Sequence, residues 1–545
     1  MKVLLINPPR RADSCMYPPM SLLYIAQAIR SVGHEAQIID IPYLLEKHPK
    51  KFGLLNNSIF DYILQQEFDV LGLGGVVSTY FFYDYFVKKI KAAKKNIPIV
   101  VGGSVGAPIK DVWLKHAPVD FLVEGDGEIV IQKLLKYIEG KCSIQDVPGL
   151  YYMKNGKYEF NQPEIVADLD TIPFLSYDEL DYEYYIDELT RWVEDIIPDK
   201  SSIQVGKLRL LPLLTSRGCP FSCTFCFHFN KTHRCHSTKY VIDYLKFLKQ
   251  KYNVNCFYII DDLFTFNRKR TVELCESIYN ANLNVSFVGS GGKPSLVTLD
   301  MLESMKKAGV IRFSYGIESG SQKMLDTMKK STTVEQNINA IKLTQKAGIP
   351  VSANIIFGMP GENAQTLEET KRFLIDTGLN INQFYAACAT AYPGTPLFEY
   401  MKEKSMVSDT REYLFKVGSI GTFLYNFSEL PLHILKKKVK NIHEQVEIAY
   451  YYRNKQYRKL LIKYCSLLFN NTTSYIKRII LSLVGNKRKM ELRKAKMAFS
   501  NFLRKNRTGG VRRSDKLSNI EVEEWIESLK ASQECGCGST FKDPQ

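Results

Sequence analysis

The first 140 residues alternate short apolar runs with segments of helical periodicity. Apolar runs at 3–6, 36–41, 70–73, 97–101 and 120–123 predict five strands. Continuous apolar strands separated by helices are typical of a parallel sheet that is covered on both faces. We therefore expect a Rossmann-like, doubly wound parallel sheet over residues 1–140. Ligands of such sheets bind beyond the carboxyl ends of the strands, where glycine-containing turns follow the last three runs.

A second alternation of strands and helices spans residues 207–400. Apolar runs predict six further strands at 208–215, 255–261, 284–289, 310–317, 351–357 and 381–388. Six strand–helix units of this length fit a partial (β/α)6 barrel, whose reactive groups gather at the carboxyl ends of the strands. Residues 141–206 form a connector between the two units. Its acidic, tyrosine-rich stretch 177–199 has no clean period, so we expect irregular helices there.

The remaining residues, 401–545, predict a basic α-helical region with a flexible polar tail that contains Cys535 and Cys537. Residues 435–513 carry 22 Lys/Arg against 3 Asp/Glu, whereas the whole chain has a net charge of +16. A solvated face, an anionic membrane surface and an acidic partner all fit this charge. The run 475–484 is too short to span a bilayer but suits its interface. Nucleic acid is not expected, because aromatic residues are not interleaved with the densest basic stretch.

Cellular location follows from the N-terminus and the cysteine content. The sequence starts as a strand and a proline turn rather than as an export signal, and no apolar run is long enough to cross a bilayer. The twelve cysteines are then better interpreted as metal ligands and buried thiols than as a disulfide framework. We expect a cytoplasmic protein, with peripheral membrane contact through the basic region as an open possibility.

Three cysteines directly follow the first predicted barrel strand, at the spacing Cys219-x3-Cys223-x2-Cys226. This spacing lets three thiolates converge on one [4Fe–4S] cubane, which usually takes four cysteines, so one iron would stay open for another ligand. A zinc site completed by a histidine and a set of buried thiols are the alternatives. The nearby histidines are His228, His233 and His236.

The motif RGCPFSCTFC resembles the signature of radical S-adenosylmethionine (SAM) enzymes. The segments 258–264, 315–321, 355–362 and 392–397 are similar, in the right order, to the barrel segments of the subgroup with an N-terminal cobalamin-binding domain. The likeness covers residues 1–400. It implies that the cluster donates one electron to SAM, which yields methionine and a 5′-deoxyadenosyl radical that abstracts hydrogen.

The resemblance also implies positions for SAM around the open iron. These are Phe225 near the adenine, Asp261 or Asp262 at the amino group, Glu318 and Ser319 near the ribose, and Gly358 against the nucleoside. The charges suit the ligand, because a sulfonium and an ammonium group need carboxylates nearby. A salt bridge at the barrel mouth is the alternative role of each acid.

The N-terminal domain resembles the cobalamin-binding domain of the same subgroup at residues 19–26, 101–104 and 123–128. The sequence contains no DxHxxG stretch, so we expect cobalamin to bind base-off without a histidine ligand. Its nucleotide tail is expected over five residues, Gly74, Gly75, Ser78, Gly102 and Gly103. The alternative is a Rossmann-like domain without a cofactor.

The leading hypothesis is a cobalamin-dependent radical SAM methyltransferase acting on an unactivated carbon. The alternatives are a cyclase or ring-rearranging enzyme with the same two cofactors and, from another class, a non-catalytic Fe–S or zinc-binding protein. A methylthiotransferase is disfavoured, because residues 1–142 hold only Cys15 and Cys142. Expected partners are a small-molecule or lipid-like substrate and an electron donor such as flavodoxin or ferredoxin. No catalytic residue is assigned, although Tyr385 and Tyr392 are candidate substrate contacts.

Overall fold

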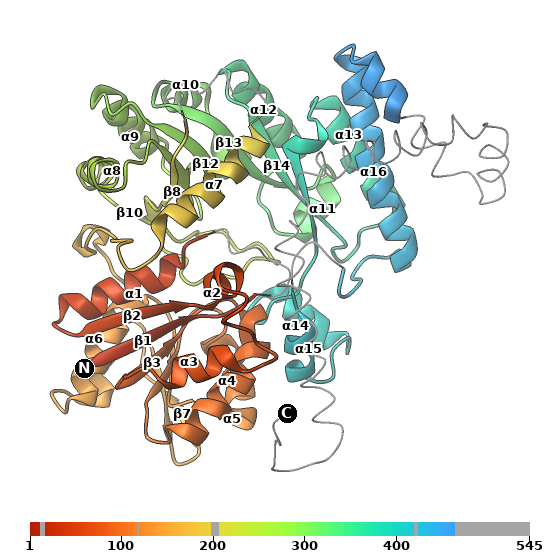
Figure 1. Cartoon of the computed structure of the whole chain (residues 1–545). Coiled ribbons are helices and arrows are strands. Elements are labelled where there is room, and N and C mark those ends of the chain that lie inside the picture. Colours follow the sequence, from red (N-terminus) through yellow and green to blue (C-terminus); the bar gives the residue numbers. More distant parts are fainter. Residues whose placement is uncertain (11–16, 118, 198–206, 419–422, 464–545) are drawn as a thin grey trace, which may run out of the picture.

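The computed structural model describes residues 1–10, 17–117, 119–197, 207–418 and 423–463. Two α/β units lie one above the other, and helices from the C-terminal part of the chain run along one side of both (Figure 1). The run 475–484 and Cys15, Cys535 and Cys537 fall outside the described residues.

The N-terminal unit is a seven-stranded sheet with the order β2-β1-β3-β4-β5-β6-β7. Its first five strands are parallel, which confirms the predicted doubly wound sheet. They are β1 Lys2–Asn7, β2 Glu35–Asp40, β3 Val70–Leu73, β4 Ile99–Val101 and β5 Phe121–Val123. The helices are α1 Met20–Ser31, α2 Ile41–Lys47, α3 Ser58–Leu64, α4 Tyr80–Ala93, α5 Lys110–His116 and α6 Gly127–Ile138. Apolar side chains on both faces of the sheet are buried, as the continuous apolar strands require.

Part of the connector extends this sheet, which the sequence did not predict, and the stretch 177–199 contains a regular helix instead of the expected irregular ones. Strands β6 Leu150–Lys154 and β7 Lys157–Phe160 form an antiparallel hairpin at the edge of β5. Asn155 and Gly156 turn the hairpin with φ of 51° and 78°, the left-handed values that an Asn-Gly two-residue turn requires. Beyond the hairpin, α7 Tyr182–Ile196 is a regular helix. Its Tyr184 and Tyr185 are buried, and the Tyr185 hydroxyl donates to Asp40 at the end of β2.

The second unit is a six-stranded parallel sheet with the order β15-β14-β13-β12-β11-β8, so β8 and β15 do not pair and the barrel is open. The predicted partial (β/α)6 barrel is confirmed. Its strands are β8 Leu210–Leu213, β11 Cys256–Ile259, β12 Ser286–Gly292, β13 Val310–Glu318, β14 Val351–Phe357 and β15 Phe384–Cys388. Its helices are α8 Thr238–Tyr252, α9 Arg268–Asn280, α10 Leu299–Lys307, α11 Gln322–Thr327, α12 Val334–Lys346 and α13 Ala364–Asp376. A short hairpin, β9 Ser216–Arg217 and β10 Arg234–Cys235, brackets the cysteine motif.

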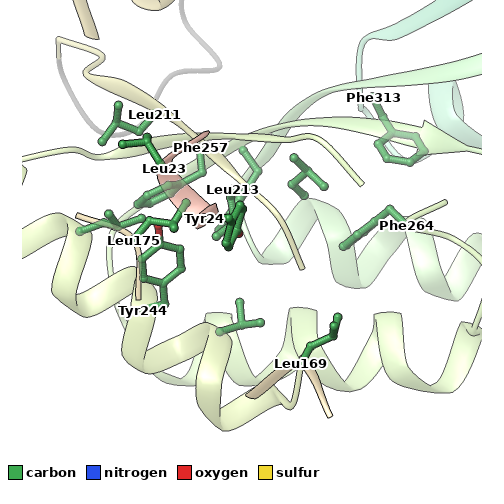
Figure 2. Packing of buried hydrophobic residues seen from close by; sticks show 14 of the residues in the cluster. Leu23, Tyr24, Leu169, Leu175, Leu211, Leu213, Tyr244, Phe257, Phe264 and Phe313 are labelled. Carbon is green, nitrogen blue, oxygen red and sulfur yellow. The ribbon is translucent and has the colours of Figure 1, made fainter. Parts of the chain in front are cut away.

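One hydrophobic core continues from the first unit into the second. Leu23 and Tyr24 of α1 belong to the same buried cluster as Leu211 and Leu213 of β8 and Tyr244 of α8 (Figure 2). A shared core of this kind fixes the relative position of the two sheets, because separating them would expose these side chains to water.

The C-terminal helices divide between the two units. Helices α14 Pro396–Glu403 and α15 Thr410–Lys416 lie beside the N-terminal sheet, whereas α16 Leu432–Arg453 packs against α13 of the barrel (Figure 1). Arg411 of α15 contacts the buried Asp84 of α4 through two nitrogens, at 3.2 and 2.9 Å. The Tyr80 hydroxyl donates to the same carboxylate at 2.7 Å. Across the described part of the chain, no helix combines the length and the apolar character that spanning a membrane demands.

We predict that Arg411→Met destabilises the protein by about 2–4 kcal/mol, because the buried Asp84 carboxylate then keeps only the half-exposed Lys88, 2.9 Å away, as a cation. Arg268→Met is the matched control, since it breaks an ion pair with Asp300 whose two side chains are exposed, and we expect it to cost under about 1 kcal/mol. Urea-induced unfolding of both variants and the parent checks this. Equal shifts in the two variants would contradict it.

Candidate active site at the barrel mouth

The cysteine motif is an irregular loop whose start is clamped by Asp261, the residue two positions after β11. The Asp261 carboxylate accepts hydrogen bonds from the Thr215 amide, the Thr215 hydroxyl and the Ser216 hydroxyl, each at 2.6 Å. From the other side, Arg270 donates to the Thr215 carbonyl at 2.9 Å. Burial raises the pKa of Asp261, although Arg270 and the three donors oppose this effect. This carboxylate is therefore engaged in holding the loop.

Asp262 has a different environment, although it was predicted as an equivalent alternative for the SAM amino group. It is exposed, and its Oδ2 accepts the Gly218 amide at 3.0 Å. Gly218 itself has a φ of 87°, and a Cβ there would collide with the Thr232 carbonyl. Of the two acids, Asp262 is the one that a cationic ligand can reach.

The thiols of Cys219 and Cys226 lie close enough to the other motif cysteines for their pKa values to be affected. Partial desolvation of the thiol raises the pKa of Cys226 to about 12, and the neighbouring Cys223 and Cys219 add to the shift. The pKa of Cys219 is raised by burial and by Cys223. Thiols in this state ionise only when a cation compensates their charge, which is what metal ligation provides.

A single metal ion does not suit the described residues. No group of three or more His, Cys, Asp or Glu side chains in them converges on one point. A cubane has a different requirement, because each of its three cysteines binds a different iron and the sulfurs stay apart. Two of the nearby histidines also have other partners. His236 stacks on Tyr240 with 4.0 Å between ring centroids and bonds Asp170, and His233 contacts the Leu263 carbonyl at 3.1 Å.

Glu318 ends β13 in a strained conformation and is paired with Lys330. Its φ of 65° is uncommon for a residue other than glycine, and such strain is concentrated at functional sites. Lys330 Nζ lies 2.8 Å from Glu318 Oε1, and both side chains are buried. Burial acts to lower the pKa of Lys330, but Glu318 and the thiols of Cys223 and Cys226 raise it overall.

A second buried lysine, Lys293, lies beside the same loop. Its ammonium group is 3.9 Å from the centroid of the Phe221 ring and donates to the Lys330 carbonyl. Burial lowers the pKa of Lys293 to about 8, with Lys330 adding to the effect. Lys330 Nζ is 6.0 Å from the ring of Phe225, the predicted adenine neighbour. Neither lysine was identified from the sequence, because nothing in the local pattern distinguishes them from surface lysines.

The structure puts Ser319 and Gly358 behind other side chains. Ser319 is fully buried, and its hydroxyl bonds the Thr370 hydroxyl at 3.0 Å. Gly358 has a φ of 90°, and its amide donates to the buried Glu362 at 2.5 Å. A Cβ on Gly358 would lie 2.7 Å from the Phe423 ring, so Phe423 covers this turn.

The predicted nucleotide-tail residues lie at the carboxyl edge of the N-terminal sheet. Gly103 has a φ of 78°, and a Cβ there would collide with the Gly75 carbonyl, so these two turns interlock. Gly74 and Gly102 are half-buried, and Ser78 is buried. The result is a ledge of half-exposed backbone, which suits close approach of a ligand.

This ledge and the cysteine loop approach each other. Gly394, in the turn after β15, has a φ of 87°, and a Cβ there would lie 2.7 Å from the Phe227 ring and 3.4 Å from Pro108. Phe227 directly follows Cys226, and Pro108 belongs to the segment after β4. Three segments that are distant in the sequence therefore meet between the two predicted binding regions.

Buried charges bind the loop to the N-terminal unit. Arg217 donates to Glu128 at 2.7 Å, and Arg234 donates to Asp126 at 2.5 Å. All four side chains are at least 86% buried. Asp126 and Glu128 begin α6, whereas both arginines come from the β9–β10 hairpin that brackets the cysteines.

Comparison with known proteins agrees with this geometry. The family model described as "Radical SAM superfamily" matches residues 213–374. An uncharacterized methyltransferase of Pyrococcus horikoshii, PH0819, is 30% identical over 73% of this chain and 83% of its own length. The anaerobic magnesium-protoporphyrin IX monomethyl ester cyclase of Rubrivivax gelatinosus is 28% identical over 76% of this chain and 72% of its own. The methyltransferase TsrM from Kitasatospora setae, solved with cobalamin and a [4Fe-4S] cluster bound, shares the fold with a TM-score of 0.64. The two chains are 15% identical, and the match covers 81% of this chain and 90% of TsrM.

We predict that Cys219→Ala, Cys223→Ala and Cys226→Ala each abolish cluster binding. Cys235→Ala is the matched control, since this thiol lies on β10 beside His233 rather than among the other three. Iron and sulfide analysis after anaerobic reconstitution measures the effect. Retention of a full cluster by any of the three variants, or its loss in Cys235→Ala, would show that the ligands are assigned wrongly.

We also predict a pH dependence from Glu362, whose pKa is raised by burial to about 8. The folded protein keeps a proton that the unfolded chain releases near pH 4.5, so stability falls as pH rises from about 4.5 to about 8. Glu362→Gln should remove this loss, which is on the order of a few kcal/mol. Unfolding free energies measured across this range for both proteins check the sign; parallel curves would exclude the effect.

Proposed function

The chain belongs to the radical SAM superfamily, and from this we propose that it is a cobalamin-dependent enzyme that methylates an unactivated carbon. The observation that carries the proposal is that Phe227, next to Cys226, and Pro108, in the segment after β4, both lie against Gly394. A methyl carrier on the sheet edge and a radical generated at the loop then share one reaction space.

The cluster and SAM belong to the barrel mouth. Cys219, Cys223 and Cys226 hold a [4Fe–4S] cluster, which supplies the electron that cleaves SAM. The fit is supported by the donor set, since three thiols lie beside two buried lysines that favour an anionic group. Asp262 is the acid that faces the SAM amino group, and Phe225 lies near the adenine.

The ribose and nucleoside contacts remain predictions that come from the family resemblance. Glu318 is the acid at the ribose, with Lys330 fixing the orientation of its carboxylate. Ser319 and Gly358 are expected to affect SAM binding through their neighbours rather than by direct contact. The Ser319 hydroxyl is bonded to Thr370, and Gly358 lies beneath Phe423.

Cobalamin belongs to the ledge formed by Gly74, Gly75, Ser78, Gly102 and Gly103, where it supplies the methyl group when bound. The solved relative TsrM carries cobalamin on the same fold, which supports this part of the proposal. Binding is base-off without a histidine ligand. His34 lies just before β2, at the opposite edge of the sheet, and its ring contacts the N-terminal amine at 3.2 Å.

The substrate is a small molecule that enters the open barrel. Asn354 of β14 and Tyr385 of β15 are register partners and both are exposed, so they are candidates for contact with it. Tyr392 has a structural role instead, because its hydroxyl bonds the Gly418 carbonyl at 3.3 Å. The proposal also includes a lipid-like molecule as the alternative substrate, an electron donor of the flavodoxin or ferredoxin type, and a cytoplasmic location.

A cyclase or ring-rearranging reaction is the second candidate. The relative from Rubrivivax gelatinosus is named as a cyclase and matches 76% of the chain, against 73% for the methyltransferase from Pyrococcus horikoshii. Both reactions use the same radical chemistry, and they differ in whether a methyl group enters the product.

We predict that the anaerobically reconstituted protein binds cobalamin at near-equal molar ratio and transfers a deuterated methyl group from labelled SAM. The reaction is run with a reductant and a metabolite and lipid extract of the source organism, and products are analysed by mass spectrometry. The Cys223→Ala variant is the control for background labelling. A product formed without the label would favour the cyclase, and failure to cleave SAM under reduction would exclude both reactions.

A further inference from the structure

The chain after α16 turns back on itself. Helix α16 ends at Arg453, and residues 457–463 form a further helical segment. This segment lies against α16, because Lys463 Nζ is 2.5 Å from Glu447 and Lys459 Nζ is 5.8 Å from the Tyr451 ring. In Figure 1 the end of α16 lies on the barrel side, far from the N-terminal sheet. We refer to residues 452–463 as the hairpin tip.

The hairpin tip exposes large apolar side chains. Tyr452, Tyr457, Leu461 and Ile462 are 68%, 58%, 65% and 39% exposed. They make up four of the twelve exposed large hydrophobic residues in the described ranges. Tyr457 and Leu461 are four residues apart and so share one face of their helical segment. Exposed apolar side chains gathered in one place indicate an interaction surface.

The same tip carries cations without acidic partners. Arg453, Lys455, Arg458 and Lys459 are exposed, and no ion pair joins any of them to an acid of the described chain. The two acids of α16 are already engaged, since Glu444 pairs with Lys440 at 3.8 Å and Glu447 with Lys463 at 2.5 Å. The unneutralised charge of this surface is therefore positive.

We propose that the hairpin tip docks the enzyme on an anionic lipid bilayer. Tyrosine rings suit the headgroup region, leucine and isoleucine suit the acyl boundary, and flanking lysines and arginines attract anionic lipids. A nucleic acid explains the cations but leaves the aliphatic Leu461 and Ile462 without a partner, since bases stack on aromatic rings.

The segment that directly follows the tip does not offer a better cover for this surface. Residues 464–513, which follow directly, hold 13 Lys/Arg and one Asp/Glu. Packing that segment over the tip would bring like charges together, whereas an anionic membrane would attract both. The surface is independent of the chemistry proposed for the barrel.

The test is sedimentation of the full-length protein with two kinds of vesicle, phosphatidylcholine alone and phosphatidylcholine mixed with phosphatidylglycerol. We expect binding to the mixed vesicles only, weakened by added salt. Tyr457→Ser with Leu461→Ser, and Arg458→Glu with Lys459→Glu, should each lower the binding roughly tenfold or more. Tyr279→Ser on α9 is the matched control, because Tyr279 is 57% exposed and lies outside the tip; it should bind as the parent does.

Three outcomes would overturn the proposal. The parent protein stays in the supernatant with both kinds of vesicle, or the Tyr457/Leu461 variant binds vesicles as well as the Tyr279→Ser control. The third outcome is a lower thermal midpoint and faster amide exchange at the tip in the Tyr457/Leu461 variant. It would mean that another part of the chain covers Tyr457 and Leu461. RNA binding is measured for the parent and for the Arg458/Lys459 variant. Equal RNA binding by the two proteins would support the membrane assignment, because it would show that RNA does not use the cations of the tip.

Discussion

The hydrogen bonds that Asp261 accepts are the constraint on which the rest of the site depends. The cysteine loop lacks regular structure over its ligand-bearing part, so its own backbone does not fix the three thiols. Asp261 binds the amide and hydroxyl of Thr215 and the hydroxyl of Ser216, while Arg270 holds the Thr215 carbonyl. Because Asp261 follows β11, the position of the loop is inherited from the rigid barrel sheet.

Positively charged side chains beside the cysteine loop favour the binding of an anionic group there. Lys293 and Lys330 are buried beside it, and only Lys330 has a carboxylate partner in the described structure, Glu318. A buried charge without a partner is costly, and a cluster held by thiolates supplies the missing negative charge. The raised pKa of the Cys226 thiol agrees with this, since Lys330 lowers it less than desolvation and the two neighbouring thiols raise it.

The sequence was sufficient for the features that depend on local periodicity. The five parallel strands of the first sheet, the six barrel strands and the position of the cysteines after β8 were all predicted, because apolar runs and turn residues are neighbours in the chain. The roles of Asp261 and Lys293 were not predictable, since both depend on contacts with residues more than 30 positions away. The β6–β7 hairpin was missed although its Asn155-Gly156 turn is a local signal, whereas the burial of Tyr184 and Tyr185 depends on the neighbouring unit.

The ion pairs of Arg217 and Arg234 with Asp126 and Glu128 have a thermodynamic consequence. Arg217 lies two residues before Cys219, and the two acids start the helix that follows β5 at the glycine-lined edge of the other sheet. Two buried ion pairs therefore join the cysteine loop to the carboxyl edge of the other sheet. Coupling between two binding sites is reciprocal. If a ligand on the sheet edge stabilises the cysteine loop, a cluster bound in that loop strengthens the binding of the ligand by the same free energy.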